Sequence, residues 1–409
     1  MKVIVLAGGN DQMALMEELR NIYANIEIIL IDYSPNVVAS KFADKHFLTS
    51  TMDIEKVKQI AIDEKVDYVL TACGDQPLLT MAVVSEDLGL PCYLTKKQVL
   101  NLTNKMYMKN LMMENNIPTS KFKIFTSVDS LDVTGLRYPL IVKPVDSNGS
   151  KGVSRVATFE ELRRQAKLSF EYSLTKTVIV EEFVDGVEIS ADFYVIDGLV
   201  QKVMMSQLNK FNVDNSTSVI YQSIVPPNIN FVAESKLRKI ASDIAVVFGI
   251  VNSPLLIQAI VNGDDVNVIE FSARLGGGAK YKSIQNITGF NVLKANIESM
   301  FGLKPKISID NDAMCYSRCH FYLKGGVFSK IEGIEELLDD GIIEEYIQTK
   351  PYGVSVNPPR SSSDRVASVF IKALDLKSLR EKVLLIVNHV KILDDCGKDI
   401  FERSMYLNN

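Results

Sequence analysis

Three short segments of this chain carry residue types suited to phosphate and metal chemistry. They read Leu-Ile-Val-Lys-Pro-Val-Asp-Ser-Asn-Gly-Ser-Lys-Gly-Val at 140–153, Glu-Glu-Phe-Val-Asp-Gly-Val-Glu at 181–188, and Val-Ile-Glu-Phe-Ser-Ala-Arg-Leu-Gly-Gly-Gly at 268–278. The first supplies a lysine beside a glycine-bearing loop, the second a turn flanked by carboxylates, and the third a carboxylate and an arginine on one strand. Together, in this order, they indicate ATP chemistry.

The first segment pairs a lysine with a polar loop. Lys143 ends an apolar strand predicted over 138–143, where its amine can reach a phosphate while its stem packs. Backbone N–H groups of the loop that follows can close over phosphates. The loop residues in question are Ser147, Asn148, Gly149, Ser150 and Gly152. The order of a Walker A loop is absent, and a solvated hairpin turn is the alternative for this segment alone.

The second segment ends a buried strand with a hinge, formed by Glu181, Glu182, Phe183 and Val184. Backbone groups of Glu182 and Val184 suit the amino and ring nitrogens of adenine. Glu188 follows after a turn, and its carboxylate can accept from both ribose hydroxyls because an ionised carboxylate only accepts hydrogen bonds. Two exposed acids flanking a turn are the alternative.

The third segment belongs to a predicted hairpin. Gln258 and Glu270 fall on its two strands, and oxygen ligands on adjacent strands can hold Mg²⁺. Strand alternation places Glu270, Ser272 and Arg274 on one face, so Arg274 would point at the same phosphates. The alternative is a charged strand face with a glycine turn.

The elements that position these segments begin with a parallel α/β sheet. Strands are expected at 3–7, 27–31 and 66–70, alternating with helices at 11–23, 51–64 and 77–88, and a short strand at 91–94 follows. This alternation is typical of a Rossmann-like domain. Gly8 and Gly9 lack the third spaced glycine of a dinucleotide fingerprint, which disfavours NAD.

Further along, the pattern predicts one helix at 97–115, then helices at 159–171, 234–248 and 290–300. Strands are predicted at 177–182, 188–197 and 199–206, with a hairpin at 255–261 and 265–271. Residues 208–221 are polar without periodicity and are expected to form a mobile loop. After 305 the composition changes to short strands, so a boundary is placed there.

Composition excludes several classes of protein. The 409 residues carry a net charge of −5 and a pI near 5.5, which disfavours nucleic-acid binding. No apolar run is long enough to span a membrane, and no signal peptide is recognised. Five scattered cysteines are expected to be reduced in a cytoplasmic protein. Cys315 and Cys319 read as part of a strand rather than as a zinc site.

These segments, with Asn104 and Lys105 upstream, resemble the ATP-grasp superfamily, in the branch of carbamoyl-phosphate-synthetase-like enzymes and carboxylate–amine ligases. The resemblance implies an α/β (α+β) fold in three parts. Residues 1–92 would form a Rossmann-like parallel-sheet domain preceding the ATP-grasp unit. Residues 93–305 would form the two-lobed ATP-grasp domain, with a small lobe at about 105–180 and a large lobe at about 181–305. Residues 306–409 would form a small β-rich domain.

The resemblance also implies roles for single residues. Lys105 and Lys143 would contact phosphates or adenine, Glu181 and Val184 would form the adenine hinge, and Glu188 would bind ribose. The remaining four lie on the hairpin: Glu270 and Gln258 as metal ligands, Ser272 in place of the usual asparagine ligand, and Arg274 stabilising the transferring phosphoryl group. The implied cofactors are ATP and one or two Mg²⁺ ions, with Mn²⁺ as a substitute.

The implied reaction is an ATP-dependent ligation that activates a carboxylate as an acyl phosphate and couples it to an amine. The alternatives are a bicarbonate-activating or carbamoyl-phosphate-synthetase-like enzyme and a nucleotide-binding module without catalysis. The expected partners are small-molecule carboxylates and amines, with no nucleic acid and no membrane. The superfamily often forms dimers, which allows a homodimer. Lys280 and Lys282 are candidates to bind the substrate carboxylate, with surface lysines as the alternative.

Overall fold

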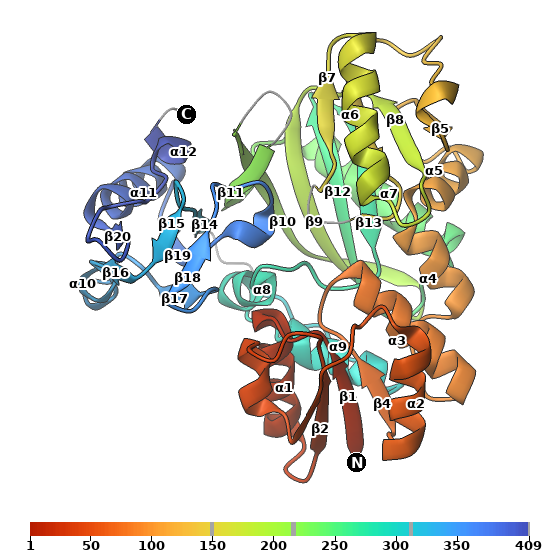
Figure 1. The fold of residues 1–409 in the computed structure, drawn as a ribbon, viewed down its shortest axis with the longest axis horizontal. Helices are drawn as coiled ribbons and strands as arrows, with labels where there is room; N and C mark the ends of the chain where they lie inside the picture. Colours follow the sequence, from red (N-terminus) through yellow and green to blue (C-terminus); the bar gives the residue numbers. More distant parts are fainter. Residues whose placement is uncertain (148–150, 214–217, 311–313, 408–409) are drawn as a thin grey trace.

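The computed structural model describes residues 1–147, 151–213, 218–310 and 314–407 (Figure 1). Its α-helices are α1 (Asn10–Ile22), α2 (Ile54–Glu64), α3 (Asp75–Leu88), α4 (Lys96–Thr103), α5 (Lys105–Glu114), α6 (Phe159–Tyr172), α7 (Phe231–Val247), α8 (Lys280–Thr288), α9 (Val292–Met300), α10 (Ile334–Asp339), α11 (Leu376–His389) and α12 (Ser404–Leu407). The strands are introduced below with the sheets to which they belong.

The N-terminal residues form the parallel sheet that the alternation predicts. Its order is β3 (Lys45–Phe47), β2 (Glu27–Ile31), β1 (Lys2–Leu6) and β4 (Tyr68–Leu70), flanked by α1, α2 and α3. The loops after β1 and β2 meet at one edge, where the Gly8 amide donates to the Asp32 carboxylate at 2.8 Å. The short strand expected at 91–94 is wrong, because those residues form no strand and lead directly into α4.

The central element is an antiparallel sheet of eight strands. Its order is β13 (Asp265–Ser272), β12 (Ser253–Asn262), β9 (Val187–Ile196), β10 (Leu199–Asn212), β11 (Ser218–Val225), β14 (Cys315–Phe321), β19 (Ala367–Ala373) and β17 (Glu345–Gln348). In the predicted β12–β13 hairpin, Gln258 lies directly opposite Glu270. Cys315 and Cys319 lie in β14, which confirms the strand interpretation.

The mobile loop predicted at 208–221 is wrong over most of its length. Residues 208–212 continue β10 and residues 218–221 begin β11, so the segment is the end of a hairpin; residues 214–217 lie outside the described part. The alternation was hidden because this stretch presents polar residues to a cavity. A β-bulge at Asn209 and Lys210 also interrupts its period of two.

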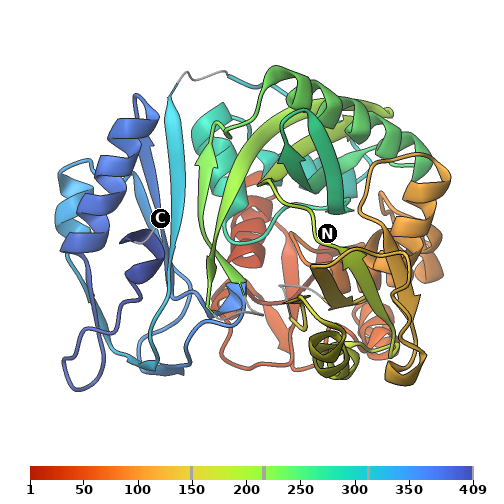
Figure 2. The ribbon, with the colours of Figure 1, turned by 90° about the horizontal axis from the view of Figure 1, so that it is seen from above.

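A smaller antiparallel sheet lies across from the central one. Its order is β5 (Phe122–Phe125), β8 (Val178–Glu182), β6 (Leu140–Pro144) and β7 (Ser154–Val156), and α6 packs against it. Figures 1 and 2 show this unit in front of strands β9, β12 and β13. The three segments singled out in the sequence therefore come from two facing sheets: β6 and β8 in one, β13 in the other.

The helix predicted at 97–115 is two helices. Asn104 has extended backbone angles, and its side chain accepts from the Met106 amide at 2.9 Å, so it ends α4 and caps α5. An asparagine side chain competes for backbone hydrogen bonds in this way, which makes it a good N-cap and a poor interior residue. As a result Lys105 is the first residue of α5.

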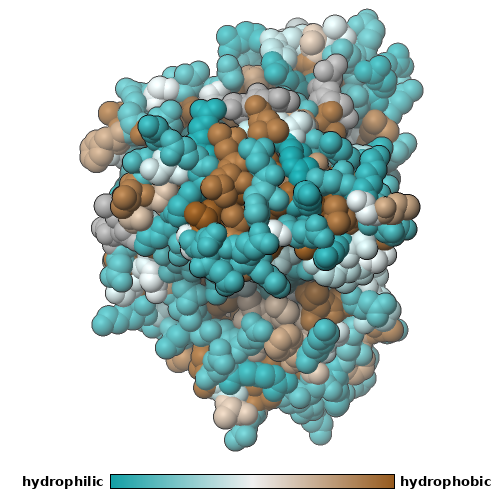
Figure 3. All heavy atoms as spheres, turned by 90° about the vertical axis from the view of Figure 1, so that its left-hand side faces the viewer, coloured by the Kyte–Doolittle hydropathy of each residue, from teal (hydrophilic) through white to brown (hydrophobic). Residues whose placement is uncertain are grey.

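The C-terminal residues combine strands with helices. Strands β14, β19 and β17 extend the central sheet, while α11, which the sequence reading did not predict, packs on β14 and β19. Four short strands form two further pairs: β15 (Gly326–Phe328) with β18 (Val354–Val356), and β16 (Lys330–Glu332) with β20 (Lys391–Leu393). On the face seen in Figure 3, apolar patches alternate with hydrophilic ones.

The buried side chains of the described residues form three clusters: one is drawn mostly from residues 315–406, one lies within residues 125–180, and the largest joins two sheets. The largest cluster includes residues of β1 together with residues of β9 and β12, so the first sheet and the central sheet are packed as one body. The boundaries near 92 and 305 stay predictions. Within the described ranges, no helix combines the length and apolar composition that crossing a membrane requires.

Candidate active site

A cavity of about 820 Å³ lies between the two facing sheets, and most of the predicted site residues line it. Those residues are Lys105, Lys143, Ser147, Glu181, Glu182, Phe183, Val184, Glu188, Gln258 and Glu270. They come from α5, β6, β8, β9, β12 and β13 and from the loops that follow β6 and β8. The fold thus brings together residues as far apart in the sequence as Lys105 and Glu270.

A few predicted residues lie elsewhere. Gly152 is outside the cavity lining; it has a positive φ of 71°, and its carbonyl accepts from the Ser169 hydroxyl at 2.6 Å. Ser272 and Arg274 are also absent from the lining and contact the N-terminal sheet domain instead. Asn148, Gly149 and Ser150 lie outside the described residues.

A buried ionic cluster forms one end of the cavity. The Glu181 carboxylate lies between two lysines: Lys109 at 2.6 Å on one oxygen and Lys143 in contact with the other. All three side chains are almost wholly buried. Burial alone would raise the pKa of Glu181, but the two lysines outweigh it and lower that pKa to about 2. Glu181 is therefore ionised, and its side chain is occupied by lysines rather than exposed.

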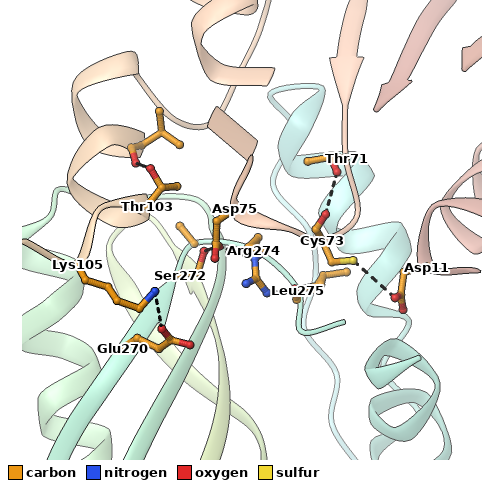
Figure 4. A network of polar contacts seen from close by, with 12 residues as sticks. Asp11, Thr71, Cys73, Asp75, Thr103, Lys105, Glu270, Ser272, Arg274 and Leu275 are labelled. Carbon is orange, nitrogen blue, oxygen red and sulfur yellow. Dashed lines mark hydrogen bonds and ion pairs between the residues drawn. The ribbon is translucent and has the colours of Figure 1, made fainter. Parts of the chain in front are cut away.

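A second ion pair lies beside the predicted metal ligands. Lys105 contacts the Glu270 carboxylate at 3.2 Å (Figure 4). It also donates to the Ser147 carbonyl at 3.0 Å. Burial opposes the ionised form of Glu270, but Lys105 and Lys143 outweigh it and lower its pKa. Glu270 is thus a carboxylate, and it faces the cavity directly opposite Gln258. Two such oxygen donors fit a Mg²⁺ ion.

Arg274 and Ser272 are joined to α3. The Asp75 carboxylate accepts from Arg274 Nε at 2.8 Å and from the Ser272 hydroxyl at 2.9 Å (Figure 4). Burial would lower the pKa of Arg274, but Asp75 outweighs this effect and raises it. Asp75 of α3 therefore fixes the orientation of the arginine, and it engages the serine hydroxyl that was expected to bind metal.

Two further contacts are made by residues that line the cavity. The Arg155 guanidinium lies over the Phe183 ring, 4.1 Å from its centroid. Lys210 of β10 pairs with Glu188 at 2.6 Å. Glu188, which was expected to bind ribose, is thus paired with a lysine from residues 208–221, the segment predicted to be a loop.

Sequence reasoning gave no role to Lys109 and Lys210; it expected Asp75 in a loop that sets specificity but did not foresee its contacts with Ser272 and Arg274. Lys109 follows Lys105 by four residues, and residues four apart share one helix face, so this spacing was an available signal. Asp75 meets residues almost 200 positions away, and nothing local in the sequence reveals that contact. Lys280 is buried against Asp192 at 2.7 Å, so the surface-lysine alternative is wrong for it; Lys282 pairs with Glu345 at 3.1 Å.

Comparisons with known proteins agree with this geometry. Residues 136–282 match the model of the ATP-grasp domain. A curated phosphoribosylamine–glycine ligase from Pyrococcus furiosus is 30% identical over 195 residues, which are 46% of this chain and 44% of that enzyme. The matched region therefore spans less than half the length of this curated relative.

Solved structures are similar over almost the whole chain. An L-amino acid ligase from Bacillus licheniformis has a TM-score of 0.83 and 20% identity, covering 96% of this chain and 98% of that one. The biotin carboxylase domain of a 2-oxoglutarate carboxylase from Hydrogenobacter thermophilus has a TM-score of 0.77 and 14% identity, covering 100% and 93%. At these identities the likeness establishes the fold alone. The ATP-grasp domain model matches residues 136–282, which include strands of both facing sheets, and the chain as a whole has the fold of these enzymes.

Proposed function

We propose that this protein is an ATP-dependent, ADP-forming ligase that joins a carboxylate to an amine through an acyl phosphate. The observation that carries the proposal is the convergence of Lys105, Lys143, Glu188 and Glu270 on one cavity between two sheets. A nucleotide needs cations at its phosphates, an acceptor at its ribose and a carboxylate for its metal, and this cavity offers all of them.

The adenine end of the cavity is the hinge after β8. Glu182 and Val184 would present backbone groups to the base, with Phe183 and its stacked Arg155 as an apolar wall. Glu188 would accept from the ribose hydroxyls. Since Lys210 already holds Glu188, we propose that this lysine keeps the acid oriented.

The phosphate end is the group of lysines. Lys105 and Lys143 would neutralise phosphate oxygens, and both form ion pairs with glutamates of the cavity. Glu270 and Gln258 would hold Mg²⁺, which neutralises charge on phosphate oxygens when bound. For Glu270 to do so, Lys105 must turn from Glu270 towards the nucleotide.

The chemistry would proceed in two displacements. A carboxylate oxygen attacks the γ-phosphorus of ATP, the bond to ADP breaks, and an acyl phosphate forms. An amine nitrogen then attacks the carbonyl carbon, phosphate leaves with the bonding electron pair, and the nitrogen loses a proton. Arg274 would stabilise the charge of the transferring phosphoryl group. Asp75 would keep Arg274 in place throughout.

The test is release of ADP and phosphate by the full chain with Mg·ATP against pairs of carboxylic acids and amines, including bicarbonate. We expect release to require one acid together with one amine. Glu270→Ala should reduce the rate roughly 100- to 1,000-fold, the usual effect of removing one electrostatic group from an active site. Release that needs bicarbonate alone would identify a bicarbonate-activating enzyme instead. Tight Mg·ATP binding without release for any pair would contradict the ligase proposal.

A further inference from the structure

A second, smaller cavity of about 250 Å³ lies on the central sheet beside the first one. We call it the side pocket. Its lining comes from β10, β11, β14, β17, β19 and α8: Met204, Ser206, Ser223, Val225, Lys280, Ser283, Asn286, Ile287, Tyr316, Ser317, Arg318, Glu344, Glu345, Phe370, Ile371 and Lys372. None of these residues belongs to the predicted nucleotide site.

We call the cavity of about 820 Å³ the nucleotide cavity, after its proposed ligand. The side pocket and the nucleotide cavity are adjacent along the same strands. On β10, Ser206 lines the side pocket and Gln207 lines the nucleotide cavity. At the boundary, Lys280 donates to the Ser190 hydroxyl at 2.5 Å, and Ser190 lies directly opposite Gln258 in the sheet. A molecule in the side pocket would thus lie next to the expected metal and phosphates.

Two buried donors in the pocket lining have no acceptor. Arg318 donates through Nη1 to the Gly278 carbonyl at 2.7 Å, but its buried Nε has no hydrogen-bond partner in the part of the chain that the structure describes. The same holds for the buried hydroxyl of Ser283. Arg318 is 7% exposed and Ser283 8%. Because an unsatisfied buried donor is costly, this pair is suited to a ligand that accepts hydrogen bonds.

The charge in the pocket floor favours an anion. Lys280 is paired with Asp192, but Arg318 makes no ion pair among the described residues. Burial and the neighbouring Arg365 lower the pKa of Arg318 to about 10, so it is still a cation at neutral pH. Asp11 and Asp192 offset part of this charge without direct contact, but no carboxylate of the described chain forms an ion pair with Arg318.

The rim and walls differ from the floor. Glu344 and Glu345 line the rim, where Glu345 is paired with Lys282 and Glu344 is exposed. Apolar side chains of Met204, Tyr316 and Phe370 form part of the wall. A ligand bound with its anion at the floor would extend an apolar body along this wall, towards acids that favour a cationic group.

The volume of the side pocket is larger than bicarbonate needs. Since one water occupies about 30 Å³ of liquid, 250 Å³ corresponds to roughly eight waters, and a four-atom anion would fill only a small part. A single amino acid has a suitable size.

We propose that the side pocket binds an amino acid with its carboxylate on Arg318 and Ser283, and that this is the acid the enzyme activates. Its role as the activated acid rests on the proposed ligase function; its binding to the pocket does not. Arg318 is the specificity-determining residue, since it supplies the charge that recognises the carboxylate.

The experiment is calorimetric titration of the full chain with the twenty L-amino acids, with and without saturating Mg·ADP. For the amino acid that binds most tightly, the matching amine without the carboxylate is titrated in parallel. We expect the amine not to bind. Arg318→Met should weaken amino acid binding by at least about tenfold, because it removes the charged partner of a buried anion. Its affinity for Mg·ADP should change less than about twofold, since Arg318 is outside the nucleotide cavity.

Arg238→Met, at an exposed position on α7, is the matched control and should leave both affinities unchanged. Ser283→Ala provides a second variant with a smaller loss of amino acid affinity if Arg318→Met does not fold. Saturable bicarbonate binding with no amino acid bound, or unchanged amino acid affinity in Arg318→Met, would overturn the proposal. Amino acid binding without any Mg·ADP binding would support the pocket and contradict the ligase function.

Discussion

Two groups of buried cations lie on the central sheet and its neighbours, and they differ in how their charge is balanced. At the nucleotide cavity, Lys109 and Lys143 share the Glu181 carboxylate, and Lys105 contacts Glu270. In the side pocket, Arg318 has a carbonyl as its acceptor and makes no ion pair with a described carboxylate. The first group is held by acids of the protein through ion pairs, whereas Arg318 in the second feels Asp11 and Asp192 without pairing with either.

This difference indicates how each site meets its ligand. In a balanced cluster the attraction between lysines and glutamates offsets the cost of burying their charges, and a lysine must share or leave its glutamate when it contacts a phosphate. An unpaired arginine costs stability in the free protein and is ready to receive an anion without rearrangement. The buried ion pairs of the nucleotide site therefore contribute to folding stability as well as to binding. The unpaired arginine of the side pocket lowers the stability of the free protein and favours binding of an anion.

The largest expected effect is loss of the acid in the balanced cluster. Glu181→Gln leaves two buried lysines without a carboxylate, and breaking a buried pair in this way costs about 3–5 kcal/mol. Urea unfolding of both proteins measures the difference. Glu182→Gln, at the next position, loses only a pair with the exposed Arg137 and should cost less than about 1 kcal/mol. Equal losses in the two variants would contradict the comparison.

Acid should weaken the same cluster. The pKa of Glu181 is about 2 in the folded protein, whereas an unfolded glutamate titrates near about 4.3. Its contribution to the free energy of unfolding is therefore complete above about pH 5 and disappears progressively as the pH falls towards 2. Unfolding measured at pH 3, 5 and 7 tests this, and Glu181→Gln should flatten the dependence. A dependence of the same steepness in the variant would assign it to other carboxylates.

A smaller effect should follow from freeing Arg274. Asp75→Asn removes the charged partner that holds the guanidinium, and a displaced catalytic group typically costs roughly ten- to a hundredfold in rate. We expect kcat to fall while KM for ATP is nearly constant, because Asp75 is outside the nucleotide cavity. Asp75→Glu should recover part of the rate. A parallel loss of ATP affinity would show that Asp75 supports the fold of the site as a whole.

The smallest effect on stability is expected at the unpaired arginine of the side pocket. Arg318→Met removes a buried cation without a carboxylate partner, so the gain from avoiding desolvation offsets the lost hydrogen bond to Gly278. We expect the free energy of unfolding to change by less than about 1 kcal/mol in either direction. Thermal unfolding measures it beside Glu181→Gln. A loss as large as that of Glu181→Gln would remove the difference between the two groups.

The sequence allowed the local part of the site to be predicted. Gln258 and Glu270 flank a short turn signal, so their pairing across the hairpin follows from the strand register. The convergence of the three segments rested on a resemblance to a known family, because short motifs do not encode which sheets face each other. Partners such as Asp75 come from a fold-level contact between α3 and the end of β13, and no local pattern reports it.

Other misses have a local physical cause. The polar residues of β10 around Lys210 read as a loop because both pockets need polar side chains on a strand that would otherwise alternate. Lys280 was expected to be either a ligand or a surface residue, whereas its buried pairing with Asp192 depends on β9 lying beneath α8. Whether a charged side chain can be buried depends on its ion-pair partner, and the partner of Lys280 is distant in the sequence.

Strand β10 also sets the distance between the two proposed ligand sites. Ser206 lines the side pocket and Lys210 the nucleotide cavity, so four residues, or roughly 13 Å of strand, separate the acid from the ribose end. Insertion of one residue here would move one reactant by about 3.3 Å and turn the intervening side chains to the opposite face. Substitutions at positions such as Met204 or Tyr316 leave that length untouched. The identity of the substrate can therefore change during evolution while the sheet keeps the separation between the two ligand sites constant.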